Sequence, residues 1–180
     1  MRVILAEKPS VAQSIAAVLG ANQKRNGYLQ GENDLVSWCI GHLIELAPPE
    51  IYDARYAKWR REDLPIVPSA WESVVSYETK KQFAVLKDLL NRTDVDEVVC
   101  ATDAGREGEL IFRMVYEKTG CTKPVKRLWF SSLEESAIRE GFRSLKPGTA
   151  YDALYRAALC RAQADWLVGI NGTRLYSRLY

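Results

Sequence analysis

The sequence predicts an α/β fold, a parallel sheet flanked by helices, followed by the start of a helical second domain. Short apolar runs typical of buried strands alternate with stretches of helical periodicity, as in parallel sheets with right-handed crossovers. After Pro147 and Gly148 this alternation ends, and residues 151–167 form a continuous helical pattern. We therefore expect one domain at 1–148 and the beginning of a helical, truncated domain at 149–180.

The first unit is predicted to be a strand, a polar loop and a helix. Residues 2–6 (RVILA) form an apolar run that ends at Glu7 and Lys8. Ser10 and Gln13 then have the spacing of a capping box, and apolar residues recur at helical intervals as far as Gly20. This order favours a buried strand whose carboxyl end carries charged side chains.

The middle of the chain is less regular. Residues 28–40 have the pattern of two strands around a turn, whereas 41–71 are rich in Trp, Pro and Tyr and show no clear period. We expect this irregular stretch to be an insertion that lies over the sheet.

Regular alternation returns in the second half. The expected elements are a helix at 80–90, a buried strand at 97–101, a polar loop at 102–108, a helix at 109–117, a strand at 125–130 and a helix capped by Ser132. The second polar loop, like the first, therefore follows a buried strand.

Composition excludes some classes of protein and leaves others open. A net charge of +2 gives no nucleic-acid signal by itself, although residues 146–180 carry five basic and two acidic side chains. No apolar stretch approaches the roughly 18 residues of a membrane-spanning helix, and no signal peptide is visible, so we expect a cytoplasmic protein without a membrane partner. The four cysteines lack zinc spacing and are expected to be reduced.

Charged side chains follow two of the predicted strands. Glu7 and Lys8 come after the first strand, and Asp103, Arg106 and Glu107 come after the strand at 97–101. Ligands bind parallel sheets at the carboxyl ends of the strands, and carboxylates beside cations suit a magnesium ion held against a phosphate. A solvated loop with internal salt bridges explains the same spacing, and the residues alone leave both readings open.

Several segments resemble one family in the order expected for it. Residues 6–10 (AEKPS) resemble the first motif of toprim domains in type IA DNA topoisomerases, and 101–109 (ATDAGREGE) are similar to their TDxDREGE motif. The segments 41–46 (GHLIEL), 128–132 (LWFSS) and 164–171 (ADWLVGIN) are similar to the topoisomerase III branch in particular. The resemblance covers nearly the whole chain and implies a toprim, Rossmann-like sheet.

The resemblance also implies a reaction and a set of roles. In this family a tyrosine attacks a DNA phosphodiester, keeps the 5′-phosphate and later reseals the break, which relaxes or decatenates DNA. Glu7, Lys8 and Arg106 would be catalytic, and Glu7, Asp103 and Glu107 would hold Mg²⁺. Lys8, Arg161 and Asp165 would contact single-stranded DNA, the last two from a helical DNA-binding domain.

None of the nine tyrosines lies in a segment that matches the nucleophile region of the family. We therefore expect the chain to need the remaining domains of the same topoisomerase and to be inactive alone. Two alternatives stay open: a toprim nuclease or primase domain, and a non-catalytic nucleic-acid-binding fragment.

Gly105 departs from the family pattern, which has a second aspartate there. The remaining oxygen donors are Asp103, Glu107 and either Glu7 or Glu109, which favours one magnesium ion over two. A glycine at this position also suits a positive φ angle. The single histidine, His42, is expected to have a structural role.

Overall fold

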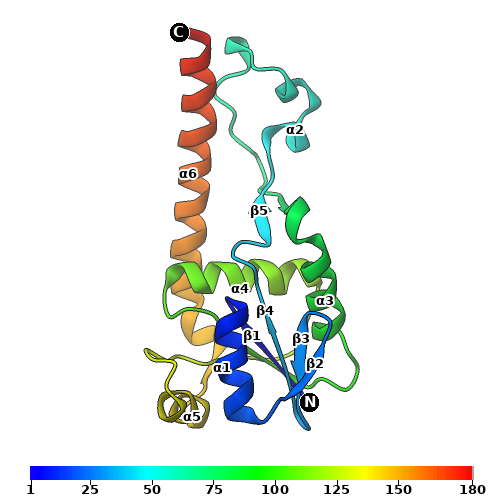
Figure 1. The fold of residues 1–180 in the computed structure, drawn as a ribbon. Helices are drawn as coiled ribbons and strands as arrows, with labels where there is room; N and C mark the ends of the chain where they lie inside the picture. The colour runs from blue at the N-terminus through cyan, green and yellow to red at the C-terminus, as the bar shows by residue number, and fades with distance from the viewer. Residues whose placement is uncertain (180) are drawn as a thin grey trace.

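The computed structural model describes residues 1–179, apart from the side chain of residue 178, and it confirms the α/β architecture (Figure 1). A seven-stranded sheet has the order β2-β3-β4-β1-β7-β8-β9. Its strands are β1 (Arg2–Ala6), β2 (Gln23–Arg25), β3 (Tyr28–Gln30), β4 (Asp34–Trp38), β7 (Glu97–Ala101), β8 (Val125–Arg127) and β9 (Lys146–Pro147). The central strands β4, β1, β7 and β8 are parallel, whereas β2, β3 and β9 pair antiparallel. The sheet is therefore mixed, with a parallel centre.

Helices cover both faces of this sheet. On one face lie α3 (Lys80–Leu90), α4 (Arg106–Thr119) and the start of α6 (Asp152–Leu179), and on the other lie α1 (Pro9–Leu19) and α5 (Glu135–Arg143). The short helix α2 (Pro49–Tyr52) lies away from the sheet (Figure 1). Successive residues of a strand face opposite sides, so Leu5 packs in one core with Phe112 of α4, while Ile4 packs in the other with Ile15 of α1. A strand buried on both faces has to be apolar throughout, which explains the sequence of β1.

The irregular middle segment does not lie over the sheet, and that prediction was wrong. Two short strands, β5 (Ile44–Leu46) and β6 (Ser73–Val75), pair antiparallel, and the chain between them lies beside the far half of α6 (Figure 1). The Asn171 side chain accepts a hydrogen bond from Ile66 N at 2.6 Å and donates one to Ile66 O at 2.9 Å. The backbone polar groups of Ile66 are therefore satisfied by a side chain of α6.

Two helix boundaries differ from the prediction. The helix α4 begins at Arg106, which places Arg106 and Glu107 on its first turn and not in a loop. Acidic side chains in a first turn are stabilised by the helix dipole. The helix α6 continues through Gly169 and Gly172 to Leu179, beyond the stretch with clear periodicity.

The caps of two helices also differ. The helix α1 begins at Pro9, with Lys8 as its N-cap and no side-chain cap, so the expected capping box of Ser10 is absent. Proline suits a first helical position because its missing N–H would have no partner there. Glu134, not Ser132, is the N-cap of α5, and the Ser132 hydroxyl accepts a hydrogen bond from Glu134 N.

Cys39, Cys100 and Cys121 are buried, Cys160 is exposed, and all four are free thiols. Across residues 1–179, no helix is both long and apolar enough to cross a membrane.

Candidate metal and nucleic-acid site

Glu7 and Asp103 lie close together at the carboxyl edge of the sheet, as predicted. The neighbouring parallel strands β1 and β7 end at Ala6 and Ala101, which are paired in register. Glu7 follows β1, and its Oε2 accepts a hydrogen bond from Asp103 N at 3.2 Å. The sheet register therefore sets the distance between these two residues.

Lys8 connects the two carboxylates. Its Nζ lies 3.8 Å from Glu7 Oε1 and 3.6 Å from Asp103 Oδ2. The Glu7 side chain is 12% exposed, whereas those of Lys8 and Asp103 are more than half exposed. The edge thus already holds one positive charge between two carboxylates.

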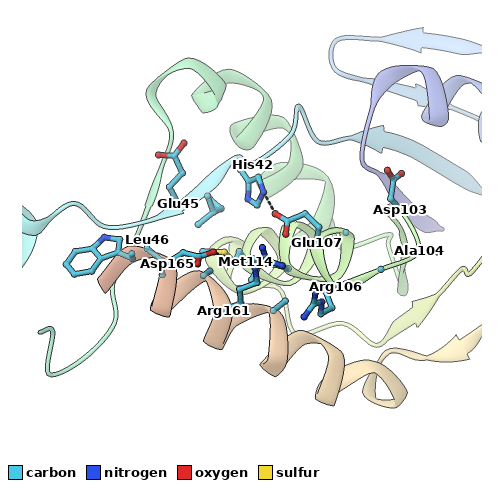
Figure 2. Close-up of a pocket in the computed structure, with 17 residues that line it drawn as sticks. His42, Glu45, Leu46, Asp103, Ala104, Arg106, Glu107, Met114, Arg161 and Asp165 are labelled. Carbon is cyan, nitrogen blue, oxygen red and sulfur yellow. Dashed lines mark hydrogen bonds and ion pairs between the residues drawn. The ribbon is translucent and has the colours of Figure 1, made fainter. Parts of the chain in front are cut away.

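Glu107, the third predicted metal ligand, is not part of this cluster. Its Oε1 lies 2.5 Å from Nε2 of His42 (Figure 2). Within the described part of the chain, no three Asp, Glu, His or Cys side chains are grouped closely enough to hold a metal ion. The structure therefore brings together Glu7 and Asp103 and places Glu107 with His42.

The carboxylates of Glu7 and Asp103 are nevertheless the type of ligand that a magnesium ion takes. Magnesium keeps several of its waters and takes one or two protein carboxylates together with phosphate oxygens. Asp103 offers an exposed carboxylate, and Glu7 stands beside it with Lys8 between them. These groups suit one hydrated ion better than a cage made only of protein ligands.

A buried arginine supports the loop that carries Asp103. Arg127, at the end of β8, is 1% exposed, and its Nε donates to Glu109 Oε2 at 3.0 Å. Its other nitrogens donate to the backbone carbonyls of Cys100, Thr102, Asp103 and Leu128. Glu109 is 1% exposed and also pairs with Arg113, so it is not available as an oxygen donor to the site.

The two glycines of this segment have different roles. A Cβ atom at Gly108 would lie 2.1 Å from the carbonyl oxygen of Asp103, so only glycine allows this close approach. Gly105 has a φ of 166°, which is extended backbone, and a Cβ there would meet nothing within 4 Å. The expectation of a positive φ at Gly105 was therefore wrong.

A cavity of about 700 Å³ opens beside this loop (Figure 2). Its lining includes His42 and the charged residues Glu45, Asp103, Arg106, Glu107, Arg161 and Asp165. Arg161 and Asp165 of α6 form an exposed ion pair at 3.6 Å. Within residues 1–179, no hydrogen bond or ion pair involves the Arg106 side chain, which is exposed. The fold thus places all the residues singled out as DNA contacts on or next to one cavity.

His42 is the site residue that sequence reasoning missed. It follows β4, which is parallel to β1, so its segment leaves the sheet at the same edge as Glu7. Glu7 and Asp103 were singled out because each follows a buried strand. The same rule would have found His42 if the pairing of β4 with β1 had been foreseen.

Comparison with known proteins identifies relatives of this chain. The Toprim domain model matches residues 2–133. The chain is 56% identical over 173 residues to DNA topoisomerase 3 of Shouchella clausii (strain KSM-K16), covering 96% of this chain and 24% of that protein. It is 51% identical over 178 residues to DNA topoisomerase 3 of Staphylococcus epidermidis (strain ATCC 12228 / FDA PCI 1200), covering 99% of this chain and 25% of that protein. The chain therefore spans about a quarter of the length of these relatives.

The fold has a counterpart among solved structures. Full-length topoisomerase I from Thermotoga maritima superposes with a TM-score of 0.62 at 24% identity, over 92% of this chain and 24% of that one. This likeness shows a shared fold. Because the Toprim model also matches most of the sequence, the chain belongs to the Toprim domain family.

Proposed function

We propose that this chain is the metal-binding domain of a type IA DNA topoisomerase of the topoisomerase III kind. Such an enzyme breaks one DNA strand, lets another strand pass and reseals the break, and so relaxes or decatenates DNA in the cytoplasm. The main support is the cluster of Glu7, Lys8 and Asp103, which adjoins a cavity lined by Arg106 and Arg161. The identity of more than 50% to two proteins named DNA topoisomerase 3 supports the same reaction.

The residues at the sheet edge would divide the chemistry between them. Asp103, Glu7 and Glu107 would hold one Mg²⁺, which neutralises phosphoryl charge and positions the strand ends. Glu7, with little access to solvent, would handle the proton of the leaving 3′-oxygen. Lys8 and Arg106 would stabilise the scissile phosphate, because both present exposed cationic groups beside the carboxylates.

Single-stranded DNA would reach this edge along the cavity. Lys8 lies beside Asp103, and Arg161 and Asp165 line the cavity from α6. On this proposal, residues 149–180 begin a helical DNA-binding domain, and the attacking tyrosine comes from the remaining domains of a longer protein. The chain itself would bind metal and DNA but leave the strand intact.

Metal binding by the chain tests this proposal. Isothermal titration calorimetry should show weak binding of Mg²⁺ that is lost when Asp103→Ala and Glu107→Ala are combined, because few fixed carboxylates face the ion. The pair Glu78→Ala and Asp88→Ala removes the same charge from exposed positions near α3 and serves as the control. Unchanged binding in the first pair would contradict the assignment.

A further inference from the structure

His42 lines the same cavity as Asp103 and Glu107 and contacts the first turn of α4. The backbone N–H of Cys39 donates to Ala6 O at 2.8 Å, which continues the pairing of β4 with β1. Gly41, with a φ of +64°, then turns the chain immediately before His42. The sheet and this turn therefore fix where the imidazole stands.

The contact with His42 occupies one oxygen of Glu107. Nε2 of His42 lies 2.5 Å from Glu107 Oε1, and both side chains are substantially exposed. In Figure 2 the Glu107 carboxylate points toward the imidazole, while Asp103 lies apart from it. An oxygen that accepts a hydrogen bond from the imidazole ring has less capacity to coordinate a cation.

We propose that His42 is a positioning residue that withholds Glu107 from the metal and releases it when the cation binds. In this structure Glu107 contacts His42, whereas Glu7 and Asp103 lie together on either side of Lys8. Because Glu107 is not grouped with Glu7 and Asp103, its carboxylate has to turn away from His42 to join them, so the His42 contact weakens the binding of Mg²⁺. The inference rests on the proposed function, in which Asp103 and Glu107 both bind the ion.

Substitution of His42 tests the sign of this effect. His42→Ala should tighten Mg²⁺ binding to the chain between about three- and tenfold, the range for losing one competing hydrogen bond. His42→Gln keeps a side-chain donor in place of the imidazole ring, and its Mg²⁺ affinity should stay close to that of the parent. The two variants therefore separate loss of the hydrogen bond from loss of the ring. In a Glu107→Gln background, His42→Ala should change nothing.

The single histidine also provides a direct spectroscopic readout. At a fixed pH, saturating Mg²⁺ should shift the ring proton resonances of His42 in the parent as Glu107 leaves it. The same titration should leave these resonances unmoved in Glu107→Gln, and NaCl of equal ionic strength should leave them unmoved in the parent. Circular dichroism melting confirms that each variant is folded.

Two results would overturn the inference. In the first, His42→Ala leaves Mg²⁺ affinity unchanged or weakens it, while Asp103→Ala still abolishes binding. The ion would then bind at Asp103 without competition from His42. In the second, neither Asp103→Ala nor Glu107→Ala alters binding. That second result would contradict the proposed function as well, whereas the first would contradict only the role of His42.

Discussion

Arg127 and Glu109 form an ion pair at 3.0 Å in which neither side chain is more than 1% exposed. Arg127 also holds the backbone carbonyl of Asp103, and Glu109 also pairs with Arg113. Arg113 in turn binds Asp152 at the start of α6. The loop with the proposed metal ligand and the helix with the proposed DNA contacts are thus joined by a continuous chain of charges.

Removing the arginine of this pair should be strongly destabilising. Arg127→Met leaves Glu109 with one partner fewer and frees four backbone carbonyls, so we expect a loss of about 3–5 kcal/mol in the free energy of unfolding. Urea denaturation measures it. Arg139→Met, which breaks an exposed pair with Glu135, is the control and should cost less than about 1 kcal/mol. Equal losses in both variants would mean that Arg127 has no special role.

Substitution by alanine should have different effects on stability at Gly105 and at Gly108. Gly108→Ala should lower stability by about 1–3 kcal/mol, because its Cβ cannot fit against the Asp103 carbonyl. Gly105→Ala should be nearly neutral. Gly105→Asp should fold normally and tighten Mg²⁺ binding, since it adds a carboxylate in open space. Unchanged or weaker binding in folded Gly105→Asp would contradict this expectation, and a fall in affinity would point to a backbone role of Gly105.

Much of the fold was predictable because its central strands are apolar throughout. The strands β1 and β7 match their predicted bounds, and the charged residues that follow them were therefore placed at the correct edge. The first turn of α4 was not predictable from apolar periodicity, since its sequence (REGE) is polar and depends on the helix dipole.

The remaining errors come from contacts between distant residues. The middle segment depends on α6, which lies more than 100 residues away, as in the pair of Ile66 and Asn171. Glu109 was a candidate ligand by spacing, but Arg127 from another strand buries it. The place of His42 in the cavity lining was not predicted, because the parallel pairing that leads its segment there is with β1, which is not the neighbouring strand in the sequence. Its expected structural role stays a prediction.

Arg161 should contribute one phosphate contact. Arg161→Ala should weaken binding of a single-stranded oligonucleotide and flatten the slope of log affinity against log salt by about 0.7, the value for one released counterion. Arg156→Ala removes the same charge from an exposed position of α6 that does not line the cavity. Fluorescence anisotropy at several salt concentrations measures both. Identical slopes for the two variants would make Arg161 a purely structural residue.

The cysteines should differ sharply in reactivity. Burial raises the pKa of the Cys100 thiol to about 11, and it raises the pKa of Cys39 further still. These buried thiols therefore stay protonated at pH 8 and are shielded from reagents. Cys160 is exposed and accessible to them. A thiol-reactive disulfide reagent should label one cysteine rapidly in the folded chain and four after denaturation. Rapid labelling that persists in Cys160→Ser would show that the cores around β1 and β7 open readily.

The proposed reaction is tested most directly by a chimera. In DNA topoisomerase 3 of Shouchella clausii, the matching quarter is replaced by this chain, and relaxation of negatively supercoiled plasmid is measured with Mg²⁺. We expect the chimera to relax DNA. Asp103→Asn and Lys8→Ala should abolish most of this activity, with little change in melting temperature because both side chains are more than half exposed. Full activity in both variants, or a folded chimera without activity, would contradict the account.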